Sequence, residues 1–128
     1  MTNKLNLKTY PNNSQRIGFI ELFGVVSRYA SDVSESRGWY IPKDDPEKLG
    51  NKIALMHSEL TEALEALRNG DQRSDHIPVF TGMEEEFADT IIRIMHFAER
   101  MNLRVAEAIL AKIEFNATRP YKHGGKKF

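Results

Sequence analysis

Hydrophobic residues recur at intervals of three and four in four segments of the chain, and no segment alternates apolar with polar residues. This spacing places apolar side chains on one face of an α-helix, whereas a half-buried strand requires alternation. The helices are expected over residues 14–36, 46–69, 82–101 and 103–115. The sequence therefore predicts an all-α fold, a four-helix bundle-like domain.

Local signals mark where these helices begin and end. Ser14 is the expected N-cap of the first helix, and Asp44 or Asp45 followed by Pro46 is typical of a helix start. A capping box opens the third helix at Thr81 and Glu84. Gly70 and Asn102 are expected to end the second and third helices.

Each predicted helix carries an apolar face that we expect to be buried. The four faces comprise Ile17, Ile20, Phe23, Gly24, Ser27 and Ala30; Ile53, Met56, Leu60, Ala63, Leu64 and Leu67; Phe87, Ile91, Ile94, Met95, Ala98 and Met101; and Val105, Ala106, Ile109, Leu110 and Ile113. Four short helices bury limited area, so a tight dimer is expected to complete the core.

The flanking segments lack this periodicity. Residues 1–13 are expected to be an N-terminal leader or loop, and residues 71–80 a loop that contains Pro78. A single domain is expected over residues 14–128, with an irregular basic tail at 116–128.

Composition excludes several classes of protein. Lys plus Arg and Asp plus Glu number 18 each, so no excess charge recruits nucleic acid or a membrane surface. Cysteine is absent, which excludes disulfides and thiolate chemistry. No segment approaches the roughly 20 apolar residues of a membrane span, and no signal peptide is visible, so a cytoplasmic protein is expected.

Two acidic motifs carry the strongest functional signal: Glu59-x-x-Glu62 in the second helix and Glu86-x-x-Asp89 in the third. Residues three apart on a helix are neighbours, so each motif points two carboxylates the same way. Both motifs flank an apolar face, where packed helices meet, and four converging carboxylates would need a cation. Oxygen ligands favour a hard cation such as Mg²⁺, with Mn²⁺ as a possible substitute.

Two other interpretations of these motifs are less favourable. A single E-x-x-E motif is usually a solvated helix surface, but two at matching positions favour a metal site. A di-iron carboxylate bundle requires Glu-x-x-His motifs, and none of the four histidines has a glutamate three residues before it.

The spacing of the two motifs resembles the E-x-x-E…E-x-x-D signature of the MazG-like nucleoside triphosphate pyrophosphohydrolases. The segment 85–92 is similar to that family's E-E-x-x-D and apolar run, and the segment 112–127 to its basic C-terminal element. Family members often have an acidic residue at the position of Ser58. This chain lacks that auxiliary acid but keeps the four principal ligands.

The resemblance implies an enzyme that hydrolyses ribo- or deoxyribonucleoside triphosphates to monophosphates and pyrophosphate. It also implies Mg²⁺, a homodimer or homotetramer, and a housekeeping role in removing unwanted nucleotides. Glu59, Glu62, Glu86 and Asp89 are the expected metal ligands and catalytic groups, and Glu62 is the first choice for orienting the attacking water.

Substrate contacts are expected from cationic and aromatic residues. Cations would offset the charge of the leaving pyrophosphate. The candidate residues are Lys112, Asn116, Arg119, Lys122 and Lys126, and Trp39 is the first candidate for stacking on a base, with Tyr40 or Phe80 as alternatives. Two further alternatives stay open: specificity like that of a dUTPase or a phosphoribosyl-ATP pyrophosphatase, and a noncatalytic helical interaction module.

Overall fold

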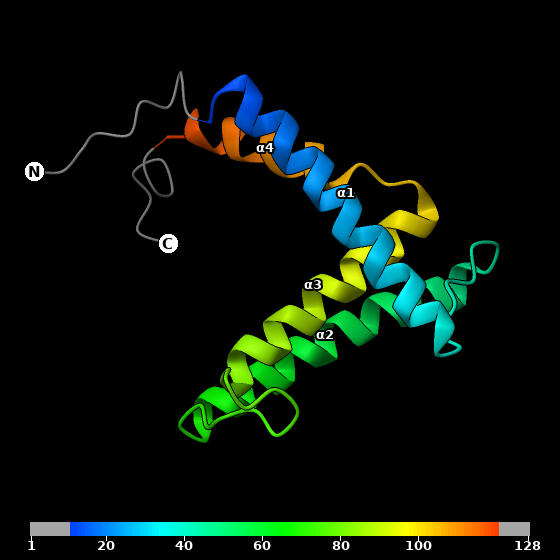
Figure 1. The fold of residues 1–128 in the computed structure, drawn as a ribbon, viewed down its shortest axis with the longest axis vertical. Helices are drawn as coiled ribbons and strands as arrows, with labels where there is room; N and C mark the ends of the chain where they lie inside the picture. The colour runs from blue at the N-terminus through cyan, green and yellow to red at the C-terminus, as the bar shows by residue number, and fades with distance from the viewer. Residues whose placement is uncertain (1–10, 121–128) are drawn as a thin grey trace, which may run out of the picture. The chain divides into compact units, whose positions relative to one another are not determined.

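The computed structural model describes residues 11–120, and their regular structure is helical (Figure 1). The helices are α1 (Asn13–Ser36), α2 (Pro46–Arg68), α3 (Gly82–Met101) and α4 (Val105–Ala117). Within this range the only β-type pairing is an isolated bridge between Arg73 and Thr81. The predicted all-α fold is confirmed, and no described helix is long and apolar enough to cross a bilayer.

The predicted signals at both ends of α3 are confirmed. Thr81 and Glu84 form the reciprocal hydrogen bonds of a capping box. Asn102 ends the helix in the left-handed conformation, with φ of 53°. At the start of α2, Asp45 accepts the backbone N–H of Lys48 and Pro46 takes the first helical position.

The predicted boundaries of α1 and α4 need correction. Asn12, not Ser14, caps α1, because Asn12 and Gln15 exchange side-chain and backbone hydrogen bonds of 2.9 Å. Leu103 was predicted to begin the fourth helix, but its N–H bonds the carbonyl of Ala98 and so completes the end of α3. The fourth helix extends through Ala117, two residues into the predicted irregular tail.

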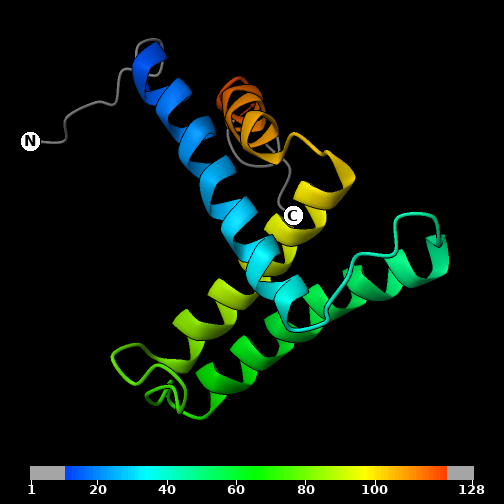
Figure 2. The same ribbon diagram turned by 45° about the vertical axis from the view of Figure 1, so that its right-hand side comes forward.

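The described residues group into two compact units, residues 11–25 with 104–120 and residues 26–103. Figures 1 and 2 show α2 and α3 of the second unit side by side, running in opposite directions. This pairing brings both acidic motifs into one unit. The expected leader falls mostly in residues 1–10, outside the described residues.

The core that a single chain buries is small. Among residues 11–120, the buried apolar residues are Ala63, Met95, Ala98 and Ala106. The structure contradicts the expected burial of Ile17, Ile53, Leu60, Leu64, Leu67, Phe87, Ile91, Ile109 and Ile113, which are all exposed. The helical periodicity is right, but periodicity alone does not ensure that an apolar face is covered.

Candidate active site

Three carboxylates from two helices converge in the second unit. Glu59 and Glu62 lie on α2 and Glu86 lies on α3, and one oxygen of each is within 4.8 Å of the others. Glu59 is buried, Glu86 is half-buried and Glu62 is exposed. The arrangement follows from the three-residue spacing on α2 and the packing of α3 beside it.

Asp89, the fourth predicted ligand, is not part of this close group. It lines a cavity together with Glu59. Burial raises the pKa of Asp89, and repulsion by Glu59 and Glu85 raises it further. The structure therefore brings three of the four predicted carboxylates together and places the fourth beside one of them.

The three clustered carboxylates have different proton affinities. Burial, a hydrogen bond with Glu59 and repulsion by the other acids raise the pKa of Glu86 to about 7. The hydrogen bond with Glu59 is also the main cause that raises the pKa of Glu62. Burial alone would raise the pKa of Glu59, but its hydrogen bonds, above all that from Arg93, hold it below the usual value. These carboxylates therefore repel one another when they are ionised.

The donor set fits a hard divalent cation. All three converging side chains offer carboxylate oxygens, and the absence of cysteine leaves no thiolate to favour a soft metal. A cation among them would relieve the repulsion that raises the pKa of Glu86.

Arg93 is a member of the site that the sequence interpretation missed. Its Nε donates a hydrogen bond of 2.6 Å to Oε1 of Glu59, and the two residues come from α3 and α2. Arg93 lies four residues after Asp89 and seven after Glu86, so all three share a helix face. That spacing is the signal that could have identified it.

A cavity of about 340 Å³ opens beside the acidic cluster. Its apolar lining includes Trp39, Ile41, Leu55, Met56, Ile92 and Phe97. Glu59, Asp89 and Arg93 line it as well, so the cavity adjoins two of the predicted ligands. Lys52 is also part of the lining.

Trp39, the predicted base-stacking residue, lies at this cavity. The guanidinium carbon of Arg93 is 6.0 Å from the centroid of the Trp39 ring. Trp39 is 61% exposed, so much of its ring is accessible for contacts. The two alternatives, Tyr40 and Phe80, are not among the described residues that line the cavity.

Three of the five predicted phosphate contacts fall within the described residues. Lys112, Asn116 and Arg119 belong to the first unit. Nζ of Lys112 lies 4.6 Å from the ring centroid of Phe115. Lys122 and Lys126 are outside the described residues. Phosphate binding by these five residues stays a prediction.

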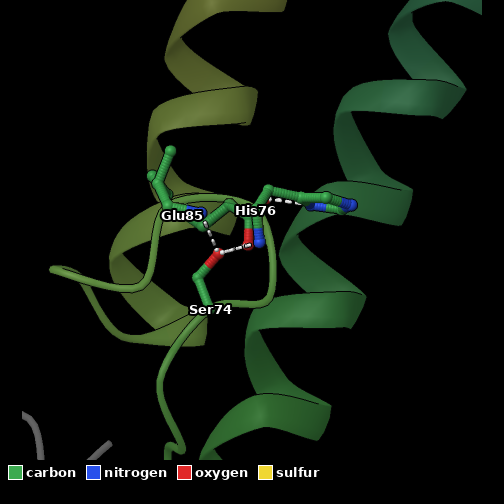
Figure 3. A network of polar contacts seen from close by, with 4 residues as sticks. Ser74, His76 and Glu85 are labelled. Carbon is green, nitrogen blue, oxygen red and sulfur yellow. Dashed lines mark hydrogen bonds and ion pairs between the residues drawn. The ribbon is translucent and has the colours of Figure 1, made fainter.

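A second polar network fastens the loop between α2 and α3 (Figure 3). Glu85 accepts a hydrogen bond from the hydroxyl of Ser74, and its other oxygen lies 2.6 Å from Nδ1 of His76. The Ser74 oxygen also accepts the backbone N–H groups of His76 and Ile77. Because Glu85 stands between the serine and the histidine, His76 is not placed to activate Ser74, and the network is a structural clasp. No sequence pattern indicated it.

Comparison with known proteins adds no relative: no family model, curated protein or solved structure matches the chain. The resemblance to the MazG-like enzymes therefore depends on the motifs alone.

Proposed function

We propose that this protein is a Mg²⁺-dependent nucleoside triphosphate pyrophosphohydrolase that yields a nucleoside monophosphate and pyrophosphate. The observation that carries the proposal is the convergence of three carboxylates within 4.8 Å beside a cavity with an exposed tryptophan. A hard-cation site next to a partly apolar cavity suits a ligand that joins a phosphate chain to a base.

Glu59, Glu62 and Glu86 would hold Mg²⁺, and Asp89 would contribute from the adjoining wall of the cavity. When bound, the metal would neutralise phosphate charge and lower the pKa of a coordinated water. Glu62 is the best candidate to take the proton of the attacking water. Its side chain is exposed, so it can reach a water bound at the site.

The cavity would hold the nucleobase. Its volume of about 340 Å³ falls at the lower end of the range for ligand sites. Trp39 would stack on the base, and Lys52 would add a positive charge to the lining that also includes Glu59 and Asp89. Lys112, Asn116, Arg119, Lys122 and Lys126 remain the proposed contacts to the phosphate chain.

A homodimer or homotetramer is part of the proposal. Leu60 and Leu64 on α2 and Ile91 on α3 are 45% to 50% exposed. Side chains of this kind are costly to leave in water when they recur along one helix face. A second copy packed on these faces would bury them, and sedimentation velocity would detect it.

The test is pyrophosphate release from a panel of ribo- and deoxyribonucleoside triphosphates, with Mg²⁺ and with a chelator. We expect release that requires Mg²⁺ and leaves monophosphate, and we expect Glu59→Gln and Glu62→Gln to abolish it. Glu65→Gln is the matched control, because Glu65 lies one turn beyond on the same helix and pairs with Arg68 at the surface. Equal turnover in all three variants would contradict the proposal.

Two alternatives give different results in the same assay. Turnover of a single pyrimidine nucleotide, or of phosphoribosyl-ATP alone, would indicate the narrow specificities. The exposed apolar faces also suit a noncatalytic helical module. That function predicts an oligomer that has no turnover. It also predicts that Glu59→Gln leaves the oligomer unchanged.

A further inference from the structure

Arg93 joins the two halves of the proposed site. Its Nε holds Oε1 of Glu59, and the same guanidinium lies 6.0 Å from the centroid of the Trp39 ring. Glu59 belongs to the carboxylate cluster and Trp39 to the apolar wall of the cavity. One side chain thus contacts a proposed metal ligand and a proposed base-stacking residue.

The contact with Glu59 fixes a carboxylate that needs a fixed orientation. The Glu59 side chain is only 9% exposed, so water cannot solvate it fully. Within residues 11–120, Arg93 provides the one N–H donor to its carboxylate, at Oε1. Oε2 accepts no N–H in this part of the chain.

The contact also leaves most of the guanidinium unused. Arg93 employs Nε toward Glu59, and its terminal nitrogens make no hydrogen bond to any described residue. The side chain is 29% exposed and lines the cavity. A guanidinium held at Nε keeps its planar fork in a defined direction, which a lysine ammonium cannot do.

We propose that Arg93 is the positioning residue of this site: it orients Glu59 so that one carboxylate oxygen faces the metal, and it transmits metal binding to Trp39 through its guanidinium. The proposal rests on the metal site of the proposed function and goes beyond it, because it assigns a role to Arg93, which acts through its contact with Glu59.

A competing role for Arg93 predicts the opposite sign. If Arg93 were a counter-ion that occupies the place of the metal, its removal would relieve repulsion and tighten metal binding. If it positions Glu59, its removal frees the carboxylate to rotate and weakens binding. Partners that orient metal ligands contribute roughly 10- to 100-fold to metal affinity.

The test is Mg²⁺ affinity measured by calorimetry without nucleotide, so that no turnover is needed. We expect Arg93→Gln to weaken Mg²⁺ binding by about tenfold. Arg93→Lys keeps the charge but loses the planar fork, so we expect it to preserve the unfolding midpoint yet weaken Mg²⁺ binding nearly as much. Unchanged or tighter binding in Arg93→Gln would overturn the proposal, and so would full recovery of affinity by lysine.

Trp39 provides a second readout, because it is the only tryptophan of the chain. In the native protein we expect the Trp39 fluorescence to change on Mg²⁺ addition. The midpoint of this change should match the Mg²⁺ concentration at the midpoint of the calorimetric titration. In Arg93→Gln we expect no change even at Mg²⁺ concentrations that saturate the site. A fluorescence change that survives the substitution would refute the link between the metal site and Trp39.

Arg100→Gln is the matched control. Arg100 lies two turns further along α3, its side chain is also 29% exposed, and it pairs with Glu35 and Asp32, which are outside the cluster. We expect it to lower stability without changing Mg²⁺ affinity. Failure of the native protein to bind Mg²⁺ at all would refute the proposed metal site itself. Normal Mg²⁺ binding that Arg93→Gln does not weaken would refute only the role of Arg93.

Discussion

The raised pKa of Glu86 makes a prediction about stability that needs no substrate. The pKa moves from an ordinary 4.5 to about 7 in the folded protein. Between these values the folded state binds more protons than the unfolded state, so the free energy of unfolding falls as the pH rises. At about 1.4 kcal/mol per pKa unit, the full shift corresponds to roughly 3 kcal/mol. Partial exposure of Glu86 reduces this, and we expect about 1–3 kcal/mol.

Replacing Glu86 by glutamine removes this penalty. In chelator, Glu86→Gln should be more stable than the native protein by about 1–3 kcal/mol at about pH 8.5, and nearly equal to it at about pH 4.5. Urea unfolding at the two pH values measures the difference. Glu99→Gln, on the same helix and outside the cluster, is the control for the loss of one charge.

Metal should reverse the order of stability. A cation that binds only the folded protein raises its stability with concentration. Saturating Mg²⁺ should therefore stabilise the native protein far more than Glu86→Gln. A stability difference between the two proteins that is the same at both pH values would refute the argument that crowded carboxylates store this energy.

Three further substitutions test the loop clasp and the cavity. Ser74→Ala leaves Glu85 without its buried donor and two backbone N–H groups without their acceptor, so we expect a loss of about 1–3 kcal/mol by urea unfolding. The hydrogen bond with Glu85 raises the pKa of His76 above its ordinary value of 6.5. The pair therefore contributes its full stability below pH 6.5, and this contribution is lost as the pH rises through the raised pKa. His76→Gln should accordingly lower the thermal midpoint at about pH 5.5 but leave it unchanged at about pH 9. Trp39→Leu should raise KM for nucleotides several-fold, as initial rates would show.

The sequence by itself determined the helices and the identity of the acidic motifs. Thr81 and Glu84 specify the start of α3 through bonds within one turn, and Asn102 specifies its end. The side-by-side direction of Glu59 and Glu62 likewise follows from the pitch of one helix. These features depend on residues at most four apart, so a local pattern is sufficient to predict them.

Only the tertiary structure decided which groups meet across helices. Arg93 reaches Glu59 over 34 positions of sequence, Asp89 stands outside the close carboxylate group, and Leu60 stays exposed although its periodicity predicted burial. Periodicity fixes the direction of a side chain around its own helix axis. Distances between helices depend on how side chains remote in sequence pack, and so do the burial and electrostatic repulsion that set the pKa of Glu86.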